Sequence, residues 1–155
     1  MLFRSFYAAC QNMTKVTALP TGFMDTSGLT GSPAVSMFNI ACYGMSGVTA
    51  LPTDFLNTSG LTGAPAVSMF YQACYNMTGV TNGNVYVGAG VTLTTTNLTS
   101  TACLTSTMQG ASRWTGQMYW GTNVIHTVIT PTNDLDTFAG CVLMPDYATI
   151  NANWK

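Results

Sequence analysis

Few side chains of this sequence could bind a metal or form a cross-link, and the five Cys are the first candidates. A zinc site or a disulfide framework uses Cys residues in close pairs, but Cys10, Cys42 and Cys74 are spaced by 32 residues. Equal spacing predicts one column of buried structural thiols without a metal. Disulfides between neighbours in the column are an alternative, because stacked chains about 4.8 Å apart come within disulfide range. Asp134 and Asp136 lie in one predicted turn, and calcium bound there is an alternative to a chain without a metal.

Acid–base and nucleophilic catalysis have a narrow basis, because the chain has one His, five Asp and no Glu. His126 lies in an alternating apolar segment, and no Gly-x-Ser-x-Gly motif surrounds any Ser. A glycosidase would need a pair of carboxylates, yet Asp25 and Asp54 have Asn57 and Gly22 as their counterparts one repeat away. We therefore predict no catalytic residue, no cofactor and no enzymatic activity, with a structural role for His126.

A repeat must position these side chains. Residues 5–36 match residues 37–68 at 21 of 32 positions. The segment Met13–Thr17 returns a third time as Met77–Thr81. Periods of about 20 to 50 residues are typical of solenoids, in which each unit stacks on the next. We therefore predict a mainly β solenoid of about five coils of roughly 32 residues, with short helical or 3-10 turns. Each coil is expected to contain one short strand, as at Val16-Thr17 and Val48-Thr49.

The second half of the chain departs from the repeat. Asn82–Asn84 is typical of a tight hairpin turn, residues 91–96 and 123–130 favour strands, and residues 145–155 favour a capping helix. The first repeat has no such cap, so its coil either packs on a partner or follows a longer chain. We predict a single repeat domain over 1–155, with regular repeats over 1–81 and irregular coils and a cap over 82–155.

Four segments place a Phe shortly before a Cys, and a strand-like phrase or a Pro follows; they begin at Phe6, Phe38, Phe70 and Phe138. This pattern resembles the BspA-type leucine-rich repeats, although the unit here is longer than theirs and Met stands where they have their first Leu. The resemblance implies a right-handed, leucine-rich-repeat-like solenoid without enzymatic activity. It also implies a role in adhesion, as in bacterial cell-surface proteins and some phage tail proteins.

Composition limits the partners. Charged residues make up 6% of the chain, the formal net charge is -1, and Lys and Arg form no cluster, so the electrostatic attraction that dominates nucleic-acid binding is missing. Every apolar stretch is far shorter than the roughly 20 residues that span a bilayer. The polar surface consists instead of neutral groups, above all 26 Thr. Such a surface suits an extracellular or particle-bound protein, and the resemblance to BspA-type repeats implies a bacterial cell surface or a virion.

Alternation in the strand phrases predicts that their hydroxyl side chains face outward and stack into a flat array. We expect this array to bind a host-surface glycan or protein, as a non-catalytic attachment module. A structural subunit that assembles with copies of itself into a fibre is the alternative, and Thr ladders also permit ice binding. Arg with nearby aromatic residues is typical of interface anchors, and a place in the core of the irregular C-terminal coils is the alternative for these aromatic residues. The predicted binding residues are Thr14, Lys15, Thr17, Ser46, Thr49, Thr78, Thr81, Arg113, Trp114, Tyr119 and Trp120.

Overall fold

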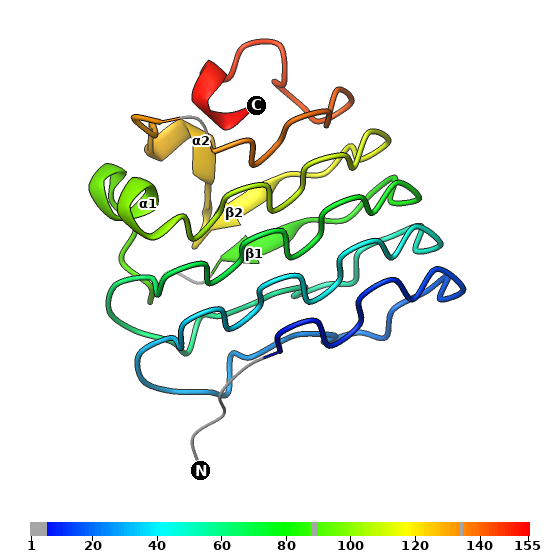
Figure 1. Ribbon diagram of the computed structural model, residues 1–155, viewed down its shortest axis with the longest axis horizontal. Helices are drawn as coiled ribbons and strands as arrows, with labels where there is room; N and C mark the ends of the chain where they lie inside the picture. Colours follow the sequence, from blue (N-terminus) through cyan, green and yellow to red (C-terminus); the bar gives the residue numbers. More distant parts are fainter. Residues whose placement is uncertain (1–5, 88–89, 134) are drawn as a thin grey trace.

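The structure is a computed structural model that describes residues 6–87, 90–133 and 135–155 (Figure 1), so the predicted turn residue Asp134 lies outside it. Its named strands form one three-stranded sheet in the order β1, β2, β3. β1 (Val85–Val87) pairs in parallel with β2 (Met118–Trp120), and β2 pairs antiparallel with β3 (Asn123–Val124). The helical segments are α1 (Thr95–Thr101), α2 (Ile125–Val128) and the 3-10 helix η1 (Ala152–Trp154).

The predicted mainly β, leucine-rich-repeat-like solenoid of about five coils is wrong. The described residues contain a single small mixed sheet with strands of three, three and two residues, and this sheet is open. Val16-Thr17 and Val48-Thr49, which were expected to be strands, lie in chain without regular secondary structure. The repeated sequence therefore forms irregular chain where strands were expected.

Left-handed backbone conformations explain why the repeated segments form neither strands nor helices. Ala8, Ile40 and Gln72, which are spaced by one repeat, have φ angles of 51°, 49° and 52°. A residue in this region turns the chain away from both the extended and the right-handed helical path. Short-range bonds such as Ala9 N to Phe6 O (3.1 Å) close the successive turns.

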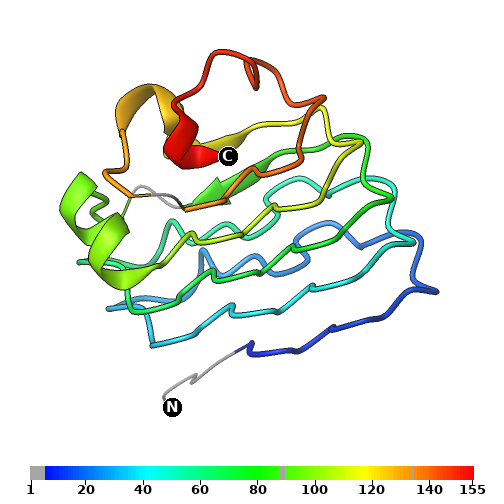
Figure 2. The same ribbon diagram turned by 45° about the horizontal axis from the view of Figure 1, so that its top comes forward.

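Backbone hydrogen bonds nevertheless join equivalent segments of successive repeats. Phe6 N donates to Met37 O (2.6 Å), and Phe38 N donates to Met69 O (2.7 Å). These bonds place segments one repeat apart side by side, as Figures 1 and 2 show for the first part of the chain. Every repeat thus supports the position of the next one.

The core consists of columns of equivalent residues. The rings of Phe6, Phe38 and Phe70 are stacked, with centroids 5.3 and 5.2 Å apart and planes 3° from parallel. Phe38 is 0% exposed, and Met45 and Met77 are buried in the same way. Burial of such columns supplies most of the stability of the first half, where regular secondary structure is missing from the described residues.

Local predictions for the second half also need correction. Asn82–Asn84 does not join a hairpin, because β1 pairs with β2 and not with the chain before this turn. The strand predicted over 91–96 gives way to α1, where the Thr94 hydroxyl accepts a hydrogen bond from Asn97 N (3.2 Å) in a capping box. Over 123–130, β3 is followed at once by α2. The helix expected at the C-terminal end is only the short η1.

Candidate binding face

A column of threonines runs across the repeats at the surface. The Thr49 hydroxyl donates to Thr17 O (3.5 Å), the Thr81 hydroxyl to Thr49 O (3.0 Å) and the Thr115 hydroxyl to Thr81 O (2.7 Å). The backbone N–H groups of Thr49, Thr81 and Thr115 donate to the same three carbonyls at 3.3, 2.9 and 3.0 Å. Thr17, Thr49 and Thr115 are exposed, and Thr81 is half-buried. The column is therefore held in register by both backbone and side chains.

Thr14, Ser46 and Thr78 form a second set of hydroxyls beside this column, and all three are exposed. Thr14 N donates to Asn12 O and Ser46 N donates to Gly44 O, both at 2.8 Å, so the two repeats share one local conformation here. We call the two sets together the hydroxyl face; it consists of Thr14, Thr17, Ser46, Thr49, Thr78, Thr81 and Thr115.

The hydrogen bonds of the threonine column decide what the face offers to a ligand. A hydroxyl has one hydrogen to donate and two lone pairs that accept. The hydroxyls of Thr49, Thr81 and Thr115 donate their hydrogens to backbone carbonyls. Their lone pairs stay available, so this column presents acceptors and suits a ligand rich in O–H or N–H groups.

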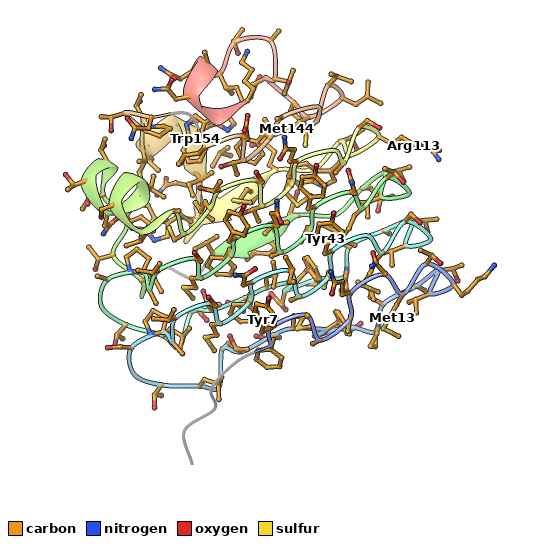
Figure 3. The ribbon with its side chains drawn as sticks, viewed as in Figure 1. Tyr7, Met13, Tyr43, Arg113, Met144 and Trp154 are labelled. Carbon is orange, nitrogen blue, oxygen red and sulfur yellow. The ribbon has the colours of Figure 1, made fainter. Side chains whose placement is uncertain are left out.

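Glycines let the backbone of neighbouring repeats approach closely beneath the hydroxyl face. A Cβ atom on Gly47 would lie 2.7 Å from Val16 O, and one on Gly79 would lie 2.7 Å from Val48 O. The counterparts of these glycines are Lys15 and Arg113, which are exposed. Arg113 lies at the same side edge of the molecule as Met13, at the right of Figure 3, so the face has a positively charged rim.

The predicted aromatic anchors do not join the hydroxyl face. Trp114 was expected to contact a ligand, but its side chain is 0% exposed and its Nε1 donates to Gly83 O (2.7 Å), so it belongs to the core. Tyr119 and Trp120 lie in β2 and are half-buried. Tyr119 stacks on Tyr86 at 5.5 Å, and Trp120 Nε1 donates to Val91 O (2.9 Å). Internal contacts therefore occupy all three rings.

Comparisons with protein-family models, with curated proteins and with solved structures find no match to this chain. The resemblance to BspA-type repeats thus rests on the sequence pattern alone and stays a prediction. In the part of the chain that the structure describes, no helix is long and apolar enough to cross a membrane. The hydroxyl face has to be judged by its own chemistry.

The predicted column of Cys10, Cys42 and Cys74 is present as free thiols, with Cys42 and Cys74 buried and Cys10 half-buried. Burial raises the pKa of the Cys42 and Cys74 thiols, and the neighbouring thiol of the column raises it further. Burial also raises the pKa of Cys103 to about 11 and that of Cys141 to about 12. A thiol is a nucleophile and a metal ligand only as the thiolate, so these side chains act as small apolar residues.

His126 packs against the core and not against a nucleophile. Its ring meets Phe138 edge-on, with centroids 6.4 Å apart. Among the described residues, no group of three His, Cys, Asp or Glu side chains is placed to hold a metal ion. Desolvation lowers the pKa of His126 from its ordinary value of 6.5, and the charge of Asp146 opposes this change.

The lowered pKa of His126 predicts a weak pH dependence of stability. Its pKa is lower in the folded chain than in the unfolded chain, so the unfolded chain binds more protons as the pH falls below about 6.5. We expect the free energy of unfolding to fall between pH 7.5 and 5.5, by less than about 1 kcal/mol because the ring is only half-buried. Urea unfolding at the two pH values measures it.

His126→Gln is the control for this prediction, because His126 is the only histidine. The variant should lose the difference between the two pH values. A difference that persists in His126→Gln would assign the effect to another group.

Proposed function

We propose that this chain is a non-catalytic attachment module of a bacterial cell surface or of a phage virion, and that its hydroxyl face binds a glycan or a protein there. The observation that supports this proposal most is the exposed threonine column. Its acceptors are spaced by the repeat and held in place before any ligand arrives, so little conformational entropy is lost on binding.

The charge of the chain also favours such a partner. Charged residues make up 6% of the sequence, so recognition has to rely on neutral hydrogen bonds and on shape. Glycans present many O–H groups and proteins present N–H groups, and both kinds of donor fit a row of acceptors. Lys15 and Arg113 at the rim add donors for acidic sugars or carboxylates.

The double variant Thr49→Val, Thr81→Val tests the proposal. Valine keeps the branched shape of threonine but removes the acceptor, and a typical hydrogen bond contributes about 0.5–1.5 kcal/mol. We expect binding to a glycan array or to intact bacterial cells to weaken about 10-fold or more. Periodate treatment of the cells should abolish binding if the partner is a glycan, and protease treatment should do so if it is a protein.

Thr53→Val is the matched control, because Thr53 is exposed in the second repeat but lies outside the hydroxyl face. It should bind as the parent chain does. Equal loss in the control and the double variant would contradict the role of the face. A parent chain that binds neither glycans nor cells, or that shows thermal hysteresis in ice instead, would contradict the proposed function.

A further inference from the structure

A row of tyrosine and glutamine side chains crosses the repeats on the segments that precede the hydroxyl face. We call it the tyrosine row; it consists of Gln11, Tyr43, Tyr75 and Gln109. Backbone hydrogen bonds hold the row in register. The N–H group that follows each member donates to the carbonyl of the next member, at 2.7 Å to Tyr43 O, 2.8 Å to Tyr75 O and 2.9 Å to Gln109 O. Each repeat therefore contributes one member at a fixed position.

The two tyrosines of the row turn their edges and hydroxyl groups outward. The rings of Tyr43 and Tyr75 are stacked, with centroids 5.1 Å apart and planes 6° from parallel, and both side chains are half-buried. Stacking covers the ring faces, so the edges remain for a ligand. The edge of an aromatic ring carries partial positive charge and the face partial negative charge. The exposed edges therefore attract oxygen atoms.

The polar groups of the row are available to a ligand. Among the described residues, none forms a hydrogen bond with the hydroxyls of Tyr43 and Tyr75 or with the amide of Gln109, and none of these groups is buried without a partner. A phenol and an amide each both donate and accept hydrogen bonds. The row thus offers donors and acceptors, whereas the threonine column offers acceptors.

Charge is absent from the surroundings of the row. Residues 36–45, 68–77 and 102–111, which carry its last three members, include no Asp, Glu, Lys, Arg or His. In Figure 3, Tyr43 lies inward of the edge at which Met13 and Arg113 lie, so the row is not part of the positively charged rim. An acidic ligand gains nothing at such a site, and a neutral ligand rich in hydroxyls fits it.

The spacing of the row favours a sugar chain over a peptide. Side chains on one face of an extended peptide recur about every 6.8 Å, so a peptide falls out of step with rings that lie 5.1 Å apart. An α-helix has a closer pitch of about 5.4 Å, but it uses its backbone N–H and C=O groups internally. A hexose unit of a linear glycan has a similar length and carries several hydroxyls, each of which donates and accepts.

We propose that the tyrosine row binds a neutral linear glycan that lies along the stack of repeats, with about one sugar unit for each repeat. This site goes beyond the proposed function, because it is separate from the hydroxyl face and does not depend on what that face binds. The ligand contacts side chains whose positions are already held by the backbone, so little conformational entropy is lost on binding.

Affinity electrophoresis in gels that contain hydroxyethyl cellulose, a linear mannan or a xylan tests the site. We expect at least one of these neutral polysaccharides to slow the parent chain. In the double variant Tyr43→Phe, Tyr75→Phe the dissociation constant should rise about 10-fold, because two hydroxyl partners are lost. The variant keeps both rings and their stacking, so its thermal unfolding should match that of the parent chain.

The double variant Tyr86→Phe, Tyr119→Phe is the matched control. Tyr86 and Tyr119 are the stacked pair of β1 and β2, with ring centroids 5.5 Å apart, and they lie outside the row. This control should bind the polysaccharide as the parent chain does. Calorimetry with oligosaccharides of the same glycan gives a second measurement. Affinity should rise with length up to about four sugar units, the number of members in the row, and then level off.

Three results would overturn the proposal: a parent chain that none of the three polysaccharides slows, equal loss of binding in the two tyrosine double variants, or affinity that does not depend on oligosaccharide length. The variant Thr49→Val, Thr81→Val separates this site from the hydroxyl face. It should keep its affinity for the polysaccharide even if it no longer binds cells. Loss of polysaccharide binding in that variant, with binding intact in Tyr43→Phe, Tyr75→Phe, would assign the glycan to the hydroxyl face instead and refute the row.

Discussion

Replacing Phe38 by Ala is expected to lower the free energy of unfolding by about 3–5 kcal/mol, the usual cost of removing a buried aromatic ring. Phe38 is 0% exposed and stacks on Phe6 and Phe70 at once, with ring centroids 5.3 and 5.2 Å away. The loss removes both contacts and leaves a cavity between two repeats. Because domains of this size are stable by only about 5–15 kcal/mol, the variant should lose a large share of the chain's stability.

Urea unfolding followed by circular dichroism measures this loss, with Val35→Ala as the control. Val35 is also apolar and lies in the same pair of repeats, but it is 64% exposed. Its replacement should change the free energy of unfolding by no more than about 0.5 kcal/mol. A Phe38→Ala variant that loses less than about 1.5 kcal/mol would show that the phenylalanine column does not hold the repeats together.

The phenylalanine column shows which part of the fold could be predicted from the sequence. Identical residues at identical spacing in adjacent repeats have to occupy equivalent positions, so the repeat predicts which side chains share a column. Cys10, Cys42 and Cys74 follow the same rule. The sequence does not show how the chain runs between the columns.

The strands at Val16-Thr17 and Val48-Thr49 were predicted from the β-branched residues there, and this preference depends strongly on context. Several residues in each repeat are left-handed: at Asn12, Gly44 and Asn76 the residue type favours this conformation, but at Ala8, Ile40 and Gln72 it does not. A β-branched residue such as Ile is a rare choice for that conformation. Contacts between repeats must impose the left-handed conformation at Ile40, and the residues around it in the sequence do not predict it.

The hydroxyl face was predicted more completely than the fold. Thr17, Thr49 and Thr81 share a column because they are 32 residues apart. Thr115 was missed because it lies 34 residues beyond Thr81, although its hydroxyl donates to Thr81 O as the pattern requires. Trp114 was predicted to contact a ligand together with its neighbour Arg113. Arg113 is exposed, but Trp114 is buried and its Nε1 donates to Gly83 O.

Replacing Gly79 by Ala should destabilise the chain by about 1–3 kcal/mol, because the new methyl group meets backbone and not a movable side chain. It would lie 2.7 Å from Val48 O and even closer to Ser46 O. To relieve this contact the second and third repeats must move apart, which stretches the bond from Thr81 N to Thr49 O (2.9 Å). Urea unfolding measures the loss, and ligand binding should weaken with it.

Gly28→Ala separates this effect from the general consequences of replacing glycine. A Cβ atom on Gly28 meets nothing within 4 Å, and Gly28 does not have the left-handed φ of residues such as Gly31. Alanine restricts the unfolded chain, so this control should stabilise the protein by about 0.4–1 kcal/mol. Opposite signs for the two glycines mean that close approach of the repeats, and not flexibility, requires glycine at position 79. Equal signs would refute the tight contact beneath the hydroxyl face and, with it, the fixed spacing on which binding is proposed to depend.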